Sequence, residues 1–520
     1  MSKLPEMIQA LMRPEAYPEL TKRIELEQTQ MSFVFLTDNY AYKVKKPVNL
    51  GYLDYTTLEK RRHFCYKEVE LNKRLCNDAY LEVLTINHQR HSYSIGGAGI
   101  VMEYVVKMRR LPQQLMMDRL IERSEVTNEM IGRLADKINT FHKYAETSNK
   151  INNFGSLDII SRNTEENFSQ TEKYIDNTIS SKQYKQIRNY NYVFLSNNAE
   201  LFKKRVGSNC IRDCHGDLHT AHICFENGIC IYDCIEFNDR FRYGDVAAEV
   251  AFLAMDLDHH GRADLSRSFV KIYIARSGDV ELKKLLNFYK CYRAYVRGKV
   301  ASFKLDDVYT TDAEKEKAIE TASSYFDLAC TYVKSKPNLI ITTGLIGSGK
   351  TTLSKALASR MGLVVLSSDV IRKRLARIPQ TEHRFETYNS GIYSPEFSRK
   401  TYDAMFFEAK NILSEGDSVI MDGSFIKNAE RQRAKSLAEE MNASFYILEC
   451  SPDEETIQRY LNRRLQKDNV SDGRWEIYLV QKDNFEPVLE VSPHKHVIIN
   501  TAQPIYDTVR YVIDKIVRNE

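Results

Sequence analysis

The sequence predicts two domains that both combine helices and strands: an α+β domain over residues 1–335 and an α/β domain over residues 336–520 with a five-stranded parallel sheet. Three observations support this prediction. A chain of 520 residues is too long for one hydrophobic core. Short strands with one inserted helix fill residues 31–106, and a long polar helical stretch follows them. After residue 338, apolar β-branched runs alternate with helical segments, which is typical of a parallel sheet.

The most informative stretch is 344-GLIGSGKT-351, which fits the pattern G-x-x-x-x-G-K-[ST]. An apolar run at 338–343 precedes it and a helical pattern at 351–361 follows, so the context is that of a P-loop. Backbone N–H groups of such a loop point at phosphate oxygens, and the helix N-terminus adds positive potential. We therefore expect ATP and Mg²⁺ as cofactors, bound through Gly344, Gly347, Ser348, Gly349, Lys350, Thr351 and Thr352. Lys350 should reach the β- and γ-phosphates, and the Thr351 hydroxyl should hold Mg²⁺.

Composition limits the other classes of function. The net charge of +4 is mild, and no basic strip interleaved with aromatic residues favours a nucleic acid over a small-molecule or nucleotide-like acceptor. No apolar stretch is long enough to span a bilayer, and the first residues lack the pattern of a signal peptide. We expect a cytoplasmic protein whose ten cysteines are thiols. The oligomeric state is left open.

Five cysteines and three histidines crowd into residues 210–234. A zinc site is one interpretation of this crowding. The segment has no C-x-x-C pair, however, and Cys230 and Cys234 lie in an apolar run where cysteine is an ordinary small core residue. We favour the core interpretation.

A β-hairpin is predicted at residues 32–37 and 40–44, with Asp38 and Asn39 in its turn. Lys43 and Lys45 share one face of the second strand, so either could point into a cleft. The amphipathic helix at residues 56–75 carries Glu68.

The second informative stretch is 215-HGDLH-219, followed by a hairpin that ends at Asp233. Asp217 on a loop and Asp233 after a hairpin suit a kinase site, where one carboxylate accepts the hydroxyl proton and the other holds Mg²⁺. The alternative is a pair of buried structural aspartates beside a turn.

With these motifs, residues 1–335 resemble the aminoglycoside phosphotransferase and choline kinase group, which implies a bilobal, protein-kinase-like fold. The resemblance implies that Asp217 is the catalytic base and Asp233 a Mg²⁺ ligand. It also implies that Lys43 or Lys45 contacts the α/β-phosphates and pairs with Glu68. The backbone of residues 104–108 would meet adenine, and Asp245 would be structural.

Two departures from that group bear on activity. His222 stands where the group has asparagine as a second metal ligand, and imidazole prefers softer metals than Mg²⁺. The first hairpin has no glycine to let the backbone cover the phosphates. A weak kinase and a nucleotide-binding pseudokinase both remain open.

Arg293 and Arg297, one turn apart on a helix, are expected to form a solvated basic ridge rather than an anion contact.

In the C-terminal half, the strand predicted at residues 363–369 ends on Asp369 and Arg372 follows it, at the edge where open α/β sheets place ligands. This pair resembles that of polynucleotide kinases and zeta-toxin-like kinases. The resemblance implies that Asp369 activates the acceptor hydroxyl and Arg372 binds an acceptor phosphate. The alternative is a helix-capping aspartate with a surface arginine.

Asp422 ends a buried strand at a Walker-B-like position, where it could hold Mg²⁺; the alternative is again a helix cap. Arg463 and Arg464 end a helix just before the polar segment 467–475, which is the layout of a lid that closes on the transferring phosphoryl group. A solvated helix end is the alternative for these arginines.

The order of motifs resembles bacterial fusion proteins described as bifunctional aminoglycoside phosphotransferase/ATP-binding proteins. Three hypotheses follow. The P-loop half could be a kinase for a small metabolite, a nucleotide sugar or a nucleic-acid end, with the N-terminal half as a second phosphotransferase. The chain could instead be a nucleotide-gated regulator, or a toxin-like nucleotide-sugar kinase that its N-terminal half restrains.

Overall fold

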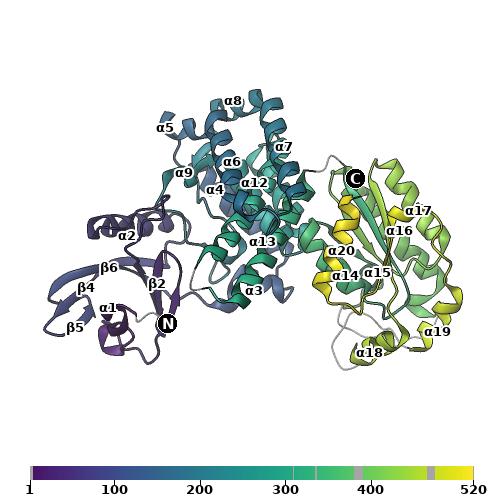
Figure 1. Ribbon diagram of the computed structural model, residues 1–520, viewed down its shortest axis with the longest axis horizontal. Helices are drawn as coiled ribbons and strands as arrows, with labels where there is room; N and C mark the ends of the chain where they lie inside the picture. The colour runs from purple at the N-terminus through teal and green to yellow at the C-terminus, as the bar shows by residue number, and fades with distance from the viewer. Residues whose placement is uncertain (1–3, 308–309, 334–335, 380–389, 465–474, 519–520) are drawn as a thin grey trace. The chain divides into compact units, whose positions relative to one another are not determined.

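The computed structural model describes residues 4–307, 310–333, 336–379, 390–464 and 475–518. The chain forms two compact units (Figure 1). The first comprises residues 1–170, 188–256 and 268–293, and the second comprises residues 171–187, 257–267 and 294–520. None of the helices in the part of the chain that the structure describes is both long enough and apolar enough to cross a membrane.

The first unit contains a six-stranded antiparallel sheet in the order β1-β2-β3-β6-β4-β5. The strands span Glu25–Gln28, Ser32–Leu36, Tyr40–Lys45, Tyr80–Gln89, Ser92–Ile95 and Ile100–Arg109 for β1 to β6. Successive residues of a strand face opposite sides, so Val105 joins the core that includes Phe35 and Tyr42, while Val106 joins the core beneath the helix α2 (Leu58–Lys73). Figure 1 shows α2 lying across the sheet.

Helices follow this sheet, as the polar helical stretch predicts. The short α1 (Glu6–Ala10) precedes the sheet. The helices after the sheet, α3 to α13 in order, span Met117–Glu122, Asn128–Tyr144, Asn149–Asn152, Leu157–Thr171, Ser181–Asn197, Ala199–Gly207, Asp239–Arg242, Val246–His259, Ala263–Ser277, Leu282–Ser302 and Asp312–Tyr332. The HGD loop, residues 215–217, lies in the chain between strands of two small antiparallel pairs. These pairs are β7 (Ile211–Asp213) with β10 (Tyr243–Asp245), and β8 (Ile223–Cys224) with β9 (Cys230–Ile231).

The second unit contains the predicted five-stranded parallel sheet, in the order β12-β13-β11-β14-β15. The strands β11 to β15 span Asn338–Thr343, Val364–Ser367, Val419–Asp422, Ser444–Cys450 and His496–Ile499. The central strand β11 is buried along its whole length, as expected for a strand covered on both faces.

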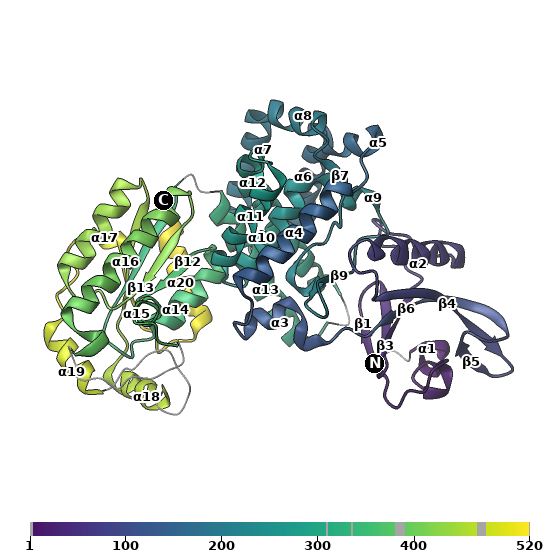
Figure 2. The same ribbon diagram turned by 180° about the vertical axis from the view of Figure 1, so that it is seen from behind.

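Helices cover both faces of this sheet. Leu339 and Ile341 of β11 pack with α16 (Pro395–Ser414) and α17 (Asn428–Glu440), whereas Ile340 packs with α14 (Lys350–Met361) and α20 (Ile505–Arg518). Figure 2 shows α16 and α17 on the opposite face from α14 and α20. The remaining helices are α15 (Ser368–Leu375), α18 (Glu454–Arg464) and α19 (Trp475–Asn484).

Two expectations from the sequence are wrong. Cys76 and Cys230 form a disulfide, because the end of α2 lies against β9. Arg293 is not part of a solvated ridge: its guanidinium donates to the carbonyl of Gly216 at 3.2 Å and lies 4.6 Å from the ring centre of Phe252. Arg293 therefore packs against α10 and the HGD loop, whereas Arg297 lies over the ring of Tyr325, 5.5 Å from its centre.

Replacing Asp245 with alanine should destabilise the first unit by about 1.5–3 kcal/mol, because the buried Arg205 loses its two hydrogen bonds to Asp245 and keeps only Asp279 as a carboxylate partner. Asp245 accepts hydrogen bonds from Arg205 at 2.9 Å and 2.6 Å, and both side chains are buried. The measurement is the urea midpoint of unfolding. The matched control is Glu200→Ala, which removes an exposed pair with Lys203 on the same helix as Arg205 and should cost less than about 1 kcal/mol. Equal midpoints for the two variants would contradict the prediction.

Candidate active site

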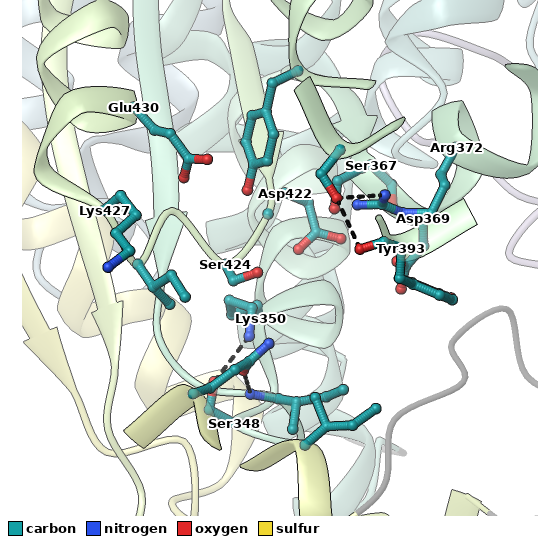
Figure 3. A pocket seen from close by; sticks show the side chains of 18 of the residues that line it. Ser348, Lys350, Ser367, Asp369, Arg372, Tyr393, Asp422, Ser424, Lys427 and Glu430 are labelled. Carbon is teal, nitrogen blue, oxygen red and sulfur yellow. Dashed lines mark hydrogen bonds between the residues drawn. The ribbon is translucent and has the colours of Figure 1, made fainter. Parts of the chain in front are cut away.

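A pocket of about 660 Å³ opens where β11, β12 and β13 end. Because these strands are parallel, the segments that follow them meet at one edge of the sheet. The P-loop follows β11, the helix α15 follows β12, and residues 423–427 with the start of α17 follow β13. Figure 3 shows Lys350 of α14, Asp422 at the end of β13 and Glu430 of α17 around one hollow. A parallel sheet with this loop after its central strand is the P-loop NTPase fold that the sequence predicts.

The P-loop needs glycine at two positions for space as well as for backbone angle. Gly344 has a φ of +133°, and a Cβ there would lie 2.5 Å from the carbonyl oxygen of Cys450. Gly347 has a φ of +80°, and a Cβ there would lie 2.9 Å from Leu461. Because glycine has no Cβ, the loop can turn tightly against β14 and α18 at these two positions.

Lys350 lies inside the loop. Its ammonium donates to the carbonyls of Gly344 at 3.0 Å and Leu345 at 2.7 Å, and to the Ser348 hydroxyl at 3.3 Å. The loop carbonyls therefore hold the Lys350 ammonium, which we expect to contact the phosphates of ATP. The predicted residues Gly347, Ser348, Gly349, Lys350 and Thr351 line the pocket; Thr352 is exposed on α14.

Thr351 and Asp422 come together as predicted. The Thr351 hydroxyl donates to Oδ2 of Asp422 at 2.8 Å. Burial raises the pKa of the Asp422 carboxyl, and the Thr351 hydrogen bond opposes that shift. A helix cap is excluded for Asp422, since α17 begins six residues later with Lys427 at its N-cap. A hydroxyl and a carboxylate are oxygen ligands of the kind that Mg²⁺ prefers, so this pair fits the ion.

Asp369 and Arg372 line the same pocket from α15. Asp369 is not the N-cap of that helix, because Ser367 holds that position. Arg372 is not on the surface: it is 7% exposed, donates to the carbonyl of Ile392 at 2.8 Å and to Ser398 at 3.1 Å, and lies over the ring of Tyr393. No carboxylate in the described ranges pairs with Arg372, so its charge is open to an anionic ligand.

Glu430 is a pocket residue that the sequence analysis missed. Burial raises its pKa to about 7, although Arg431 and Lys427 oppose the shift. A glutamate in a first helical turn looks like an ordinary partner of the helix dipole, so its position in the sequence carried no signal.

The pKa of Glu430 predicts a pH-dependent stability. Because the folded protein holds this pKa above that of the unfolded chain, the protonated form stabilises the fold at low pH, and that contribution is lost as the pH rises through about 7. The melting temperature should therefore fall from about pH 5 to about pH 8, and Glu430→Gln should flatten the fall. The exposed Glu439 on the same helix is the control, as Glu439→Gln should keep the slope. A wild-type slope in Glu430→Gln would assign the pH dependence to another group.

The predicted lid has no structural account. Arg463 and Arg464 end α18, but their side chains and residues 465–474 lie outside the described residues.

One further contact of the P-loop was not predicted: the backbone N–H of Ile346 donates to Gln481 of α19 at 2.8 Å.

In the first unit, both predicted lysines contact Glu68. Lys43 lies 2.8 Å and Lys45 2.6 Å from its carboxylate. Lys45 also bonds Glu236 and is 2% exposed, so it belongs to the core. Lys43 reaches Asp233 at 2.7 Å, which makes Lys43 the lysine beside the predicted metal ligand. Burial lowers the pKa of Lys43, but the two carboxylates outweigh that effect and raise it above its usual value.

The residues of the HGD loop also gather as predicted. His222 lies between Asp217 and Asp233, with 3.6 Å from a ring nitrogen to each carboxylate. Burial lowers the pKa of His222 to about 4, helped by the neighbouring His219, so the imidazole is neutral near pH 7. Asp233 has a φ of +62°, an uncommon angle that points to a functional constraint. A neutral imidazole between the two carboxylates does not fit Mg²⁺, which prefers oxygen ligands.

Glu249 is a second residue that the sequence analysis missed. Its buried carboxylate accepts the backbone N–H groups of His215 at 2.8 Å and Gly216 at 2.7 Å, and contacts His142 at 2.8 Å. Burial would raise the pKa of Glu249, but His142 and the other contacts lower it, so the carboxylate stays charged and holds the HGD loop. An acidic residue inside the apolar run at 246–257 was the available signal.

A family model described as an AAA domain matches residues 339–488. A cytidylate kinase of Archaeoglobus fulgidus is 28% identical over 150 residues, which cover 28% of this chain and 79% of the kinase. An uncharacterized protein of Mycobacterium tuberculosis is 30% identical over 430 residues, which cover 82% of this chain and 84% of that protein.

Two solved structures are also similar. A gluconokinase from Sinorhizobium meliloti is 18% identical, with a TM-score of 0.27, and covers 36% of this chain and 95% of its own. A choline/ethanolamine kinase family protein from Mesorhizobium loti is 10% identical, with a TM-score of 0.36, and covers 60% of this chain and 92% of its own.

Proposed function

The chain belongs to the same family as the uncharacterized mycobacterial protein, and we propose that its P-loop domain is an ATP-dependent phosphotransferase. The domain would transfer the γ-phosphoryl group of ATP to a hydroxyl of a small-molecule or nucleotide-like acceptor. We place the boundary between the two domains at residues 335–336, just before β11, and the protein in the cytoplasm.

One observation carries this proposal: Asp369 and Arg372 line the same pocket as Lys350 and the Thr351–Asp422 pair. An enzyme that only hydrolyses ATP needs Lys350, Thr351 and Asp422, but it needs no residues that bind an acceptor. A carboxylate and a buried arginine that pairs with no carboxylate among the described residues, on the other side of the pocket, suit an acceptor that carries both a hydroxyl and an anionic group.

The proposed step balances in charge and atoms. The acceptor oxygen forms a bond to the γ-phosphorus while the bond from that phosphorus to ADP breaks, and the hydroxyl proton passes to the Asp369 carboxylate. Thr351 and Asp422 would hold Mg²⁺, which supplies positive charge to the phosphate oxygens. Arg372 would orient the acceptor through a bidentate contact. Arg463 and Arg464 are proposed to close over the transferring group.

The N-terminal site supports a second, weaker candidate. Asp217 as base and Asp233 and His222 as metal ligands would make a second phosphotransferase, with Lys43 rather than the buried Lys45 near phosphate. The position of His222 favours the alternative of a nucleotide-binding regulator. Restraint of a toxin-like kinase by this half remains a further alternative, and growth arrest on expression of residues 338–520 alone would support it.

The test is transfer of labelled γ-phosphate from ATP by the full-length protein to a pool of small molecules from a cell extract. We expect a labelled product that disappears with Lys350→Ala and persists with Asp217→Ala. Loss of the product only with Asp217→Ala would assign the reaction to the N-terminal site and refute the proposal for the P-loop domain.

A further inference from the structure

We propose that the side-chain amide of Gln481 donates a hydrogen bond to the phosphoryl group as this group passes from ATP to the acceptor. Gln481 is then a further catalytic residue of the P-loop domain, contributed by α19. The inference rests on the proposed function and deepens it. No motif in the sequence singled out this residue.

Aromatic packing holds α19 against the P-loop. Trp475 and Tyr478 stack with 4.7 Å between their ring centres. Tyr478 is buried, and both residues belong to one apolar cluster with Leu345 and Ile346 of the P-loop. The first turn of α19 is therefore fixed relative to the loop that we expect to bind the phosphates of ATP.

One face of α19 lines the pocket. Ile477, Gln481 and Asn484 recur at the spacing i, i+4 and i+7, which places them on one face of a helix. All three line the same pocket as Lys350. Gln481 is therefore within reach of a ligand that occupies the P-loop.

A contact with the P-loop decides which way the amide of Gln481 is turned. The backbone N–H of Ile346 points at its Oε1, at 2.8 Å, and a backbone N–H can only donate. The oxygen of the amide thus faces the loop, and the amino group Nε2 points in another direction. Among the residues that the structure describes, none accepts a hydrogen bond from Nε2. Its two N–H donors are available to phosphate oxygens, which only accept.

A single peptide group joins Gln481 to Lys350. The carbonyl of Leu345 accepts from the Lys350 ammonium at 2.7 Å, and the N–H of the same peptide group, on Ile346, donates to Gln481. Adding the bond lengths of the peptide group, Nζ of Lys350 and Oε1 of Gln481 are no more than about 8 Å apart. Two donors that bind different oxygens of one phosphoryl group are also at most about 8 Å apart. The spacing therefore allows Lys350 and Gln481 to hold one phosphoryl group between them.

The amide would stabilise charge without taking part in proton transfer. In the proposed reaction the acceptor oxygen bonds to the γ-phosphorus while the bond to ADP breaks, and both hydrogens of Nε2 stay on Gln481. A donor that is already in position stabilises the negative charge on the phosphoryl oxygens, and removing one such donor lowers the rate by about 100- to 1000-fold.

The test measures how tightly the full-length protein, with Mg²⁺, binds ADP alone and ADP with aluminium fluoride, a mimic of the phosphoryl group in transit. Gln481→Glu keeps an oxygen that can accept from Ile346 but removes both N–H donors. We expect this variant to bind ADP within about 3-fold of the wild type, and ADP with aluminium fluoride about 100-fold more weakly. The control is Leu479→Glu, which changes the net charge equally. Leu479 is 47% exposed on α19 and does not line the pocket, so both affinities should stay unchanged.

Gln481→Lys provides the opposite change, because it keeps a donor and loses the acceptor for Ile346. It should bind ADP with aluminium fluoride more tightly than Gln481→Glu does. The reverse order would mean that Gln481 only supports the P-loop, and it would overturn the inference. Equal losses of both ligands in Gln481→Glu would overturn it too, as would a wild type that gains no affinity for ADP from aluminium fluoride. None of these measurements needs an acceptor, whereas the proposed function is refuted by the label-transfer assay, so the two fail separately.

Discussion

Replacing Lys350 with alanine is expected to lower kcat/KM for γ-phosphate transfer by about 100- to 1000-fold, the usual cost of removing a preorganised group that stabilises developing charge. The loop carbonyls of Gly344 and Leu345 already hold the Lys350 ammonium within the P-loop, so the charge is in place before nucleotide binds. The measurement is the rate of label transfer at several ATP concentrations.

The matched control is Lys355→Ala, one turn further along α14. Lys355 is exposed and does not line the pocket, so its removal changes the net charge equally but takes no side chain from the pocket lining. Equal activities of the Lys350→Ala and Lys355→Ala proteins would show that the P-loop does not support the reaction.

Replacing Asp369 with asparagine is expected to lower kcat by about 100- to 10,000-fold while the affinity for ATP stays close to that of the wild type. The change keeps the shape of the side chain but removes the carboxylate that we propose accepts the acceptor proton. Because Asp369 lies on α15 and not on the P-loop, ATP binding should be spared. Steady-state kinetics and direct ATP binding together separate the two effects.

Asp507→Asn, an exposed change on α20, is the control for this experiment and should leave both parameters unchanged. A loss of ATP affinity in Asp369→Asn as large as its loss of kcat would show that the residue binds nucleotide instead of acting on the acceptor. Unchanged kcat would place the proton acceptor elsewhere, with Glu430 as the next carboxyl in the pocket.

The P-loop, the parallel sheet and the residues at its edge could be predicted from the sequence because each depends on local rules. Glycines at positive φ, a lysine at the first helical position and β-branched runs specify the loop and β11 over about a dozen residues. The parallel sheet then brings Thr351, Asp369 and Asp422 together, since the ends of its strands share one edge.

The capping alternatives could be decided only in three dimensions. An aspartate after a strand has the same local pattern whether it caps a helix or faces a pocket. The structure places Ser367 and Lys427 at the two N-caps and leaves Asp369 and Asp422 to the pocket.

The sequence by itself determined the motifs and the residues proposed for the chemistry, whereas the tertiary structure decided what surrounds them. Arg293, predicted to be solvated, packs on the HGD loop, and Glu249 holds that loop from a helix more than thirty residues away in the chain. The environment of a charge depends on contacts between distant segments, which spacing along a sequence does not encode.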